Sequence, residues 1–386
     1  MIIVGASAGG LTTAESLRRR GFGGAVTLIG DEAHLPYDRP PLTKQVLSGV
    51  WPADRARLRE REQLARLGID VITRDAAIGL DVDHRRVMTA SGGLHQGDVV
   101  VIATGARPRS LPGRQGLAGL HQIRALDDVV GLRADLRPES RVLVIGDGVL
   151  GAEAAATLRG LDHRVTLVGP QRVLMERQLG PEVGQLLTEL HAERGVDLRL
   201  DRAVDGLVSE SDRVTGARLA DGSVIPADVV VVALGAMPTT DWLDGSGLEL
   251  SDGVGCDSRC RAARNIYAVG DVARWQHERL GRPVRLENRT NATEQAQVVA
   301  DNILGASRPY VPVPYFWTDQ YDAKIQLHGL VPAGAELIVR EGNPADRRFV
   351  GHALMDGRAT GVIGWNMPKQ TRLHRREVLE SVESAP

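Results

Sequence analysis

Two glycine-rich turns in the sequence have the residue types and spacing that bind a nucleotide pyrophosphate. The first is Gly5-Ala6-Ser7-Ala8-Gly9-Gly10, which fits G-x-G-x-x-G with serine in the second glycine position. The second is Gly146-Asp147-Gly148-Val149-Leu150-Gly151, which fits the pattern in full. Small residues let the backbone approach the pyrophosphate, and the N-terminus of a following helix favours its negative charge. The pattern predicts two dinucleotides in one chain, and FAD with a nicotinamide nucleotide is the simplest pair.

The residues around the first turn predict a βαβ unit. Residues 2–4 and 25–29 are short apolar runs typical of buried strands, and residues 11–20 carry helix formers with one apolar face. Asp31 and Glu32 follow about twenty residues beyond the turn, where a carboxylate binds a ribose hydroxyl.

The second turn has similar surroundings, with predicted strands at 141–145 and 165–168 and a helix from Ala152 to about Leu161. The acid expected at the end of the second strand is missing, because Gly169-Pro170-Gln171-Arg172 stands there. Without that acid, the preference for a free 2′-hydroxyl is lost. Arg172 either accepts a 2′-phosphate, which would favour NADPH, or faces solvent, and the sequence leaves both readings open.

Further strand patterns predict how the chain divides into domains. Residues 98–103 and 228–233 are apolar runs that end in glycine turns, and residues 266–271 add another strand followed by an acid. The second lobe is therefore predicted to be inserted into the first. The predicted domains are 1–110 with 236–308 for FAD, 111–235 for the nicotinamide nucleotide, and 309–386 as a small C-terminal domain with an antiparallel sheet and a terminal helix.

Composition narrows the class of protein. The 386 residues are 42% hydrophobic and 25% charged, which excludes disorder, and the net charge of −2 provides no global field for nucleic acid or anionic membrane. No apolar run reaches the length of a membrane helix, and a strand begins at the N-terminus, so a soluble cytoplasmic protein is expected. Only two cysteines, Cys256 and Cys260, are present, the ten histidines are scattered, and no metal site is predicted.

Longer motifs give the chain a resemblance to a known family. They comprise Leu35-Pro-Tyr-Asp-Arg-Pro-Pro-Leu-Thr-Lys44 and Val313-Pro-Tyr-Phe-Trp-Thr-Asp-Gln-Tyr321, with shorter stretches at 103–107, 124–128, 146–153, 266–272 and 291–292. On these motifs, which span essentially the whole chain, it resembles the FAD-dependent NAD(P)H:ferredoxin reductases of the putidaredoxin reductase, rubredoxin reductase and dioxygenase ferredoxin reductase type.

The resemblance implies a fold and an activity. The fold would be α/β and glutathione-reductase-like, with two Rossmann-like dinucleotide-binding domains and a small C-terminal α+β interface domain. The flavoprotein would pass electrons from NADH or NADPH through FAD, as a hydride to N5 and then as single electrons. The acceptor would be a transiently docked iron–sulfur ferredoxin that serves a cytochrome P450 or another oxygenase.

The resemblance also implies roles for particular residues. Arg39 and Lys44 would lie near the flavin and its phosphates, and Lys44 would stabilise the negative charge of the reduced ring. Trp317 would pack beside the isoalloxazine where electrons leave. Glu153 would orient the nicotinamide through its carboxamide, although capping of its helix is the alternative.

Further contacts to the two nucleotides are expected as well. For FAD they are Gly5, Ser7, Ala8, Gly9, Gly10, Asp31, Glu32, Ala77, Ala103, Thr104, Gly105, Arg124, Gly270, Asp271, Asn291 and Ala292. For NAD(P) they are Gly146, Gly148, Val149, Leu150, Gly151, Arg172 and Gly235.

Some features leave other functions open. Many family members carry histidine and tryptophan where Asn288 and Arg289 stand here, which affects the fit of the ferredoxin. A disulfide-reductase-class enzyme would need a redox cysteine in the first lobe, which has none; both cysteines lie near residue 260 instead. An NAD(P)H oxidase, or a redox-sensing protein resembling apoptosis-inducing factor, is not excluded by any residue pattern.

Overall fold

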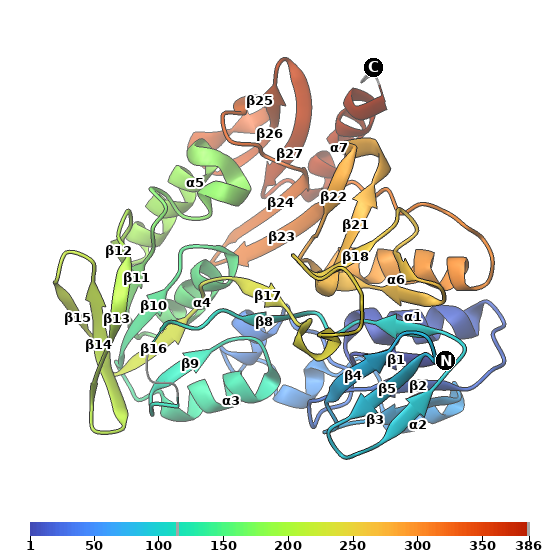
Figure 1. Ribbon diagram of the computed structural model, residues 1–386. Helices are drawn as coiled ribbons and strands as arrows, with labels where there is room; N and C mark the ends of the chain where they lie inside the picture. The colour runs from blue at the N-terminus through green and yellow to red at the C-terminus, as the bar shows by residue number, and fades with distance from the viewer. Residues whose placement is uncertain (113–115, 384–386) are drawn as a thin grey trace. The chain divides into compact units, whose positions relative to one another are not determined.

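The computed structural model describes residues 1–112 and 116–383, with side chains to residue 378. These residues form two compact units (Figure 1). The first unit contains Met1–Asp38, Asp54–Arg107 and Met237–Pro312, and the second contains Arg39–Ala53, Pro108–Ala236 and Val313–Pro386. Two of the boundaries between the units, after Arg107 and after Ala236, fall within short strands that pair with each other. These strands are β8 (Ala106–Pro108) and β17 (Ala236–Pro238).

A six-stranded sheet forms the centre of the first unit. Its order is β19-β20-β7-β1-β2-β3, with β1 parallel to both β2 and β7, and β20 parallel to β7. Its strands are short; those in the middle are apolar and buried on both faces in the manner of a parallel sheet, whereas the two edge strands are partly exposed. They are β1 (Ile2–Val4), β2 (Val26–Ile29), β3 (Ile69–Ile72), β7 (Val100–Ile102), β19 (Arg261–Ala263) and β20 (Ile266–Ala268).

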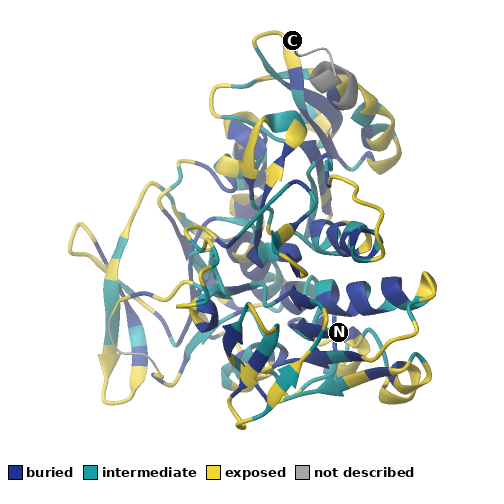
Figure 2. Cartoon of the chain, turned by 45° about the vertical axis from the view of Figure 1, so that its right-hand side comes forward, coloured by how far each residue is buried: buried dark blue, intermediate teal, exposed yellow. Residues whose placement is uncertain are grey.

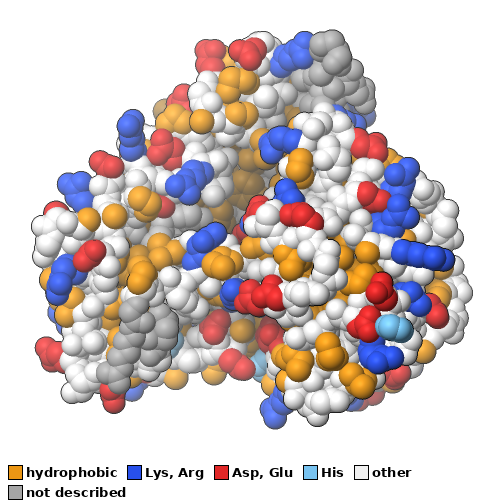
Figure 3. Space-filling model, viewed as in Figure 1, with side chains coloured by type: hydrophobic (Ala, Val, Ile, Leu, Met, Phe, Trp, Pro, Cys, Tyr) orange, Lys and Arg blue, Asp and Glu red, His pale blue; other side chains and the backbone are white. Residues whose placement is uncertain are grey.

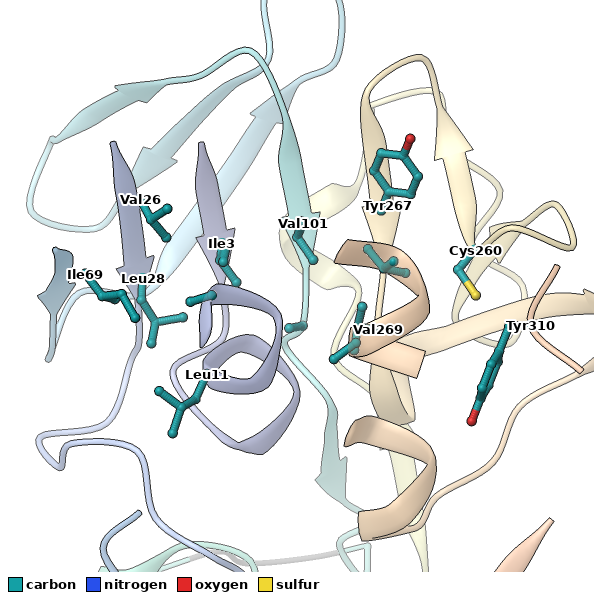
Figure 4. Packing of buried hydrophobic residues seen from close by; sticks show 14 of the residues in the cluster. Ile3, Leu11, Val26, Leu28, Ile69, Val101, Cys260, Tyr267, Val269 and Tyr310 are labelled. Atoms are coloured by element: carbon teal, nitrogen blue, oxygen red, sulfur yellow. The ribbon is translucent and has the colours of Figure 1, made fainter. Parts of the chain in front are cut away.

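Two helices pack together beside this sheet, α1 (Ala8–Arg19) and α6 (Arg289–Ile303). Figure 4 shows Ile3, Leu28 and Val101 of three neighbouring strands in one buried cluster with Leu11 of α1. The unit also contains α2 (Arg61–Arg66) and two three-stranded sheets. These are β4 (Ala77–Asp81), β5 (Arg86–Thr89) and β6 (Leu94–Gln96), and β18 (Val254–Cys256), β21 (Ala273–His277) and β22 (Arg282–Val284).

The second unit contains a five-stranded parallel sheet of order β12-β11-β10-β16-β9. Its strands are β9 (Leu120–Gln122), β10 (Arg141–Ile145), β11 (Arg164–Val168), β12 (Asp197–Arg199) and β16 (Val229–Val232). The helices are α3 (Leu126–Asp135), α4 (Val149–Gly160) and α5 (Glu176–Glu193), and a small sheet is formed by β13 (Val204–Glu210), β14 (Arg213–Leu219) and β15 (Val224–Pro226). A short π-helix covers Leu42–Val46 and contacts α4.

The C-terminal part of the second unit is an antiparallel sheet of order β23-β24-β27-β26-β25, with helix α7 packed against β24 and β27. The predicted antiparallel sheet and terminal helix are therefore present. Their bounds are β23 (Tyr315–Gln320), β24 (Ala323–Gly329), β25 (Glu336–Asn343), β26 (Arg348–Met355), β27 (Arg358–Trp365) and α7 (Pro368–Glu383).

These elements confirm the α/β fold with two dinucleotide-type sheets and a small C-terminal part. Figure 2 shows the central strands largely buried and the connecting loops largely exposed. On the face drawn in Figure 3, basic and acidic side chains are interspersed, in line with the small net charge. Among the described residues, no helix has the length and apolar character needed to cross a membrane.

Candidate functional site

The two glycine turns have the same construction, although they belong to different units. Gly5 adopts φ 120°, and a Cβ there would overlap the backbone of Ala103; Gly146 adopts φ 125° and is placed in the same way against Ala233. The third glycines, Gly10 and Gly151, lie against the carbonyl oxygens of the first glycines of their turns. Each turn therefore places the start of a helix, α1 or α4, directly beside the end of its strand, as a dinucleotide site requires.

The start of α1 fits a bound pyrophosphate. Ser7 is the extended N-cap residue, its side chain makes no capping hydrogen bond, and no acidic residue occupies the first turn. The first N–H groups of a helix have no partner within the helix, and the helix dipole favours an anion at that end. Ser7, Ala8, Gly9 and Gly10 are therefore suited to the role that the sequence predicts for them.

Other predicted flavin residues of the first unit gather near this turn. A Cβ on Gly9 would lie 3.8 Å from the carbonyl oxygen of Ala292, and a Cβ on Gly270 would lie 3.4 Å from the Ala292 side chain. Gln295 fixes this arrangement by accepting a 2.8 Å hydrogen bond from the Gly270 N–H. Asp271 follows Gly270 in a short 3-10 helix.

The N-terminus of α6 is defined by its own side chains. Asn288 is the N-cap and accepts a 2.8 Å hydrogen bond from the N–H of Asn291. Asn291 is buried and accepts a 3.0 Å hydrogen bond from Tyr310. Arg289, at the position where the family often has tryptophan, forms a 2.5 Å ion pair with Asp38.

The remaining predicted flavin residues of the first unit lie at strand ends. Asp31 follows β2 and is exposed, and Glu32 accepts a hydrogen bond from Tyr37. Thr104 donates a 2.8 Å hydrogen bond to the carbonyl of Thr239. The others are Ala77 at the start of β4, Ala103 after β7, and Gly105 with φ 69°.

Four predicted flavin residues belong to the second unit: Arg39, Lys44, Arg124 and Trp317. Arg39 donates a hydrogen bond to the carbonyl of Arg124, so these two are brought together. The Trp317 ring stacks on Tyr315, with ring centroids 6.0 Å apart.

Glu153 is the centre of a buried polar cluster in the second unit. The Lys44 ammonium donates a 2.6 Å hydrogen bond to Glu153 Oε2, and the Thr43 hydroxyl donates another of 2.6 Å to the same oxygen. Thr318 donates a 2.7 Å hydrogen bond to Oε1. Lys44 and Glu153 expose only 13% and 4% of their side chains, so this ion pair is shielded from water. Three distant segments, the π-helix, α4 and β23, thus meet at one carboxylate.

The start of α4 changes one expectation. The helix was predicted to begin at Ala152, with Glu153 in its first turn, but it begins at Val149 and has no acidic residue in the first turn. Since the helix dipole acts mainly within the first turn, helix capping does not explain Glu153. Val149 and Leu150 occupy the first turn instead, and Gly148 is the N-cap.

A chain of hydrogen bonds extends the Glu153 cluster into the interior. Gln320 donates a 3.0 Å hydrogen bond to the Thr318 hydroxyl, and its own oxygen accepts a 2.7 Å bond from His191. Burial lowers the pKa of His191 to about 4, so the ring is neutral and carries its proton on the nitrogen that faces Gln320. All donors in this chain of hydrogen bonds point toward Glu153.

Sequence reasoning did not identify Thr43, Thr318, Gln320 or His191. Thr43 and Thr318 lie inside the two longest motifs quoted above, which was the available signal. Their contacts to Glu153 span 110 and 165 residues, so no local spacing rule connects them.

The remaining residues predicted to contact NAD(P), and one further residue, belong to the second unit. Arg172 is exposed, and its backbone N–H donates a 3.1 Å hydrogen bond to Glu176. Gly235 has φ 84° and follows β16. Asp147, inside the glycine turn, is buried and accepts hydrogen bonds from Gln171.

The two cysteines are poor candidates for redox chemistry. Burial raises the pKa of Cys260 to about 12 and also raises the pKa of Cys256. Thiols held in the protonated form are weak nucleophiles. The structure therefore gives no support to the disulfide-reductase alternative.

The fold brings together two histidines that look scattered in the sequence. His352 Nε2 and His374 Nδ1 are 3.0 Å apart, and Glu377 lies 3.2 Å from His352 Nδ1. Glu341 lies 2.8 Å from His374 Nε2, and Arg340 approaches His352 Nδ1 to 3.4 Å. These contacts form a polar link between β25, β26 and α7.

Comparison with known proteins places these features in a family. Residues 1–296 match the family described as pyridine nucleotide-disulphide oxidoreductase, and residues 315–385 match the reductase C-terminal family. The chain is 38% identical to the 5,5'-dehydrodivanillate O-demethylase ferredoxin reductase subunit of a Sphingobium species, over 90% of this chain and 85% of that protein. It is 35% identical to the benzene 1,2-dioxygenase system ferredoxin–NAD(+) reductase subunit of Pseudomonas putida, over 100% and 93%. A crystal structure of the covalent putidaredoxin reductase–putidaredoxin complex superposes with a TM-score of 0.93 at 31% identity, over 98% of this chain and 93% of that chain.

Proposed function

Because the chain belongs to the pyridine nucleotide-disulphide oxidoreductase family, and within it to the ferredoxin reductases, we propose that it passes electrons from NAD(P)H through FAD to an iron–sulfur ferredoxin. That ferredoxin would in turn serve a cytochrome P450 or another oxygenase. The proposed location is the cytoplasm. The proposed domains are 1–110 with 236–308 for FAD, 111–235 for NAD(P), and 309–386 as the C-terminal interface domain.

The observation that carries the proposal is the buried Lys44–Glu153 pair beside the second glycine turn. A carboxylate has about four acceptor positions, and Lys44, Thr43 and Thr318 use three of those on Glu153. One position is left for a donor such as the carboxamide N–H of a nicotinamide. A charged pair shielded from water is expensive to maintain for structure alone, which favours a functional role.

FAD, when bound, supplies acceptance of a hydride and release of single electrons. The residues of the chain supply binding and orientation. The turn at 5–10 and the start of α1 bind the FAD pyrophosphate, and Asp31 binds the adenosine ribose. Lys44 places a positive charge beside the ring, and Glu153 holds the nicotinamide in register.

We propose further residues as contacts to FAD and to NAD(P). The proposed FAD contacts are Glu32, Arg39, Ala77, Ala103, Thr104, Gly105, Arg124, Gly270, Asp271, Asn291, Ala292 and Trp317. The proposed NAD(P) contacts are Gly146, Gly148, Val149, Leu150, Gly151 and Gly235. Arg172 remains a candidate only for a 2′-phosphate.

Anaerobic stopped-flow reduction of the purified flavoprotein tests the proposal. We expect NADH or NADPH to bleach the flavin absorbance rapidly, and a [2Fe–2S] ferredoxin to restore it much faster than air does. If neither nucleotide bleaches the flavin, the reductase proposal fails. If air restores the absorbance as fast as ferredoxin does, the protein is an oxidase instead.

A further inference from the structure

The carboxylate that the end of β11 lacks is provided by the glycine turn itself. We propose that Asp147 takes the place of the missing ribose-binding acid and makes this chain select a nucleotide with a free 2′-hydroxyl, NADH, over one with a 2′-phosphate. The inference rests on the proposed function, because it concerns the nucleotide that would donate electrons. It assigns a specificity-determining role to a residue that the sequence pattern treats as a variable position of the turn.

Asp147 and a side chain at residue 169 would compete for one volume. Gly169 is the first residue after β11, where the expected acid would stand, and a Cβ built on it would overlap the Asp147 carboxylate. An acid at the strand end and an acid at this turn position are therefore mutually exclusive. The Asp147 carboxylate thus lies beside the place where an acidic side chain at residue 169 would begin.

The Asp147 carboxylate is held in a fixed orientation by one residue. Its Oδ2 accepts a 2.6 Å hydrogen bond from the backbone N–H of Gln171, and its Oδ1 accepts a 2.6 Å bond from the Gln171 side-chain amide. These two donors leave about half of the acceptor positions of the carboxylate unused. A Cβ on neighbouring Gly148 would meet no atom within 4 Å, so there is open space over the turn from which a ribose hydroxyl can donate.

The charge of Asp147 is buried and has no counterion. The residue is 4% exposed, and within the described part of the chain no basic side chain forms an ion pair with it. A buried carboxylate without a cation strongly disfavours a second anion nearby, and a phosphate carries up to two negative charges. A neutral ribose hydroxyl, in contrast, adds a third hydrogen bond.

The nearby arginines do not offset this charge. Arg199 and Arg202 bond to Gly169 only through their backbones; the Arg199 side chain pairs with Asp197, and that of Arg202 donates to the carbonyl of Asp201. Arg172 is exposed, and its backbone is bonded to the acidic side chain of Glu176. The geometry therefore favours the reading in which Arg172 faces solvent over the one in which it binds a 2′-phosphate.

Binding of two nucleotide fragments tests the inference without depending on electron transfer. Isothermal titration of the flavoprotein with ADP-ribose and with 2′-phospho-ADP-ribose should show at least tenfold tighter binding of ADP-ribose. Asp147→Asn keeps the shape and an acceptor for Gln171 but removes the charge, and it should reduce this preference by about tenfold, the usual worth of a hydrogen bond to a charged group. Asp201→Asn, which removes an exposed carboxylate from the adjacent loop, is the matched control and should leave the ratio unchanged.

Three results would overturn the inference. In the first, the wild type binds 2′-phospho-ADP-ribose more tightly than ADP-ribose and Arg172→Ala abolishes that preference. In the second, Asp147→Asn weakens the binding of both fragments equally. In the third, the ratio of the two affinities is the same in Asp147→Asn as in Asp201→Asn. If Asp147→Asn fails to fold, the affinity ratios of the two fragments in the wild type and in Arg172→Ala still test the inference. If the ratio is as expected but neither NADH nor NADPH bleaches the flavin, the reductase proposal fails while the role of Asp147 stands.

Discussion

Thr318 donates a 2.7 Å hydrogen bond to Glu153 across 165 residues of sequence, and this bond links β23 of the C-terminal sheet to α4, the helix that follows β10 of the parallel sheet. The same hydroxyl accepts a 3.0 Å hydrogen bond from Gln320, which is bonded to the neutral ring of His191. Thr318 is therefore a positioning residue, since it fixes the carboxylate proposed to orient the nicotinamide.

Thr318→Val should slow flavin reduction by NAD(P)H by about tenfold, because a hydrogen bond to a charged group is lost and Glu153 becomes free to rotate. Thr318→Ser keeps the hydroxyl and should recover most of the rate. Stopped-flow reduction and thermal unfolding, measured together, check this. A purely structural role would lower the melting temperature of Thr318→Val and leave the reduction rate unchanged.

Glu153→Gln should lower the free energy of unfolding by about 3 kcal/mol, because it leaves the shielded ammonium of Lys44 without a counterion. The double variant Lys44→Met with Glu153→Gln should regain much of that stability but not the rate of flavin reduction. Urea denaturation and stopped-flow reduction of Glu153→Gln, of Lys44→Met and of the double variant test both parts. Full additivity of the two single stability changes would show that the pair is not coupled.

Gly148→Ala should separate nucleotide binding from folding. Gly148 has φ −83°, and an added Cβ meets no protein atom within 4 Å, so the fold tolerates alanine there. The methyl group would occupy the space that a pyrophosphate needs, and ADP-ribose binding should weaken by at least tenfold with an unchanged melting temperature. Gly206→Ala, at another open glycine of the second unit, is the control and should change neither quantity. Unchanged binding in Gly148→Ala would remove the second turn from the nucleotide site.

The protein should become less stable as the pH is lowered, because His191 is buried in its neutral form. Burial holds its pKa at about 4, well below the ordinary value of 6.5, so below pH 6.5 the unfolded chain takes up a proton that the folded chain does not. The free energy of unfolding is therefore unaffected by protonation of His191 above pH 6.5. It decreases as the pH falls from 6.5 toward 4, by up to about 3 kcal/mol. Urea denaturation at a series of pH values should show a smaller loss for His191→Gln than for the wild type. The exposed His84→Gln serves as control, and the proposal for His191 fails if both variants behave alike.

Local patterns predicted much of this fold, and the reason lies in how each pattern works. The strands at 2–4, 141–145 and 266–268 are short apolar runs bounded by glycine turns, so hydrophobicity and turn chemistry coincide there. The helix starts were predicted about three residues late, at 11 instead of 8 and at 152 instead of 149, because the small residues of the turns already belong to the helices.

The site was predicted only in part, for a different reason. Lys44 and Glu153 were both identified, but not as a pair, since 109 residues separate them and only the tertiary fold brings them within 2.6 Å. The pairing of Asp147 with Gln171 was not predicted, because 24 residues separate the two and the glycine pattern places no requirement on the residue at 147.

The insertion of one sheet into the sequence of the other sets an order of events during synthesis. Strand β7, at 100–102, pairs with β20, at 266–268, so β7 lacks one of its two neighbours until the ribosome has made more than two thirds of the chain. The parallel sheet of 120–232 has all its strands once residue 232 is made, before β20 exists. The N-terminal strands must therefore wait, with apolar surface uncovered, while later residues already fold, and this exposes the nascent chain to aggregation at that stage.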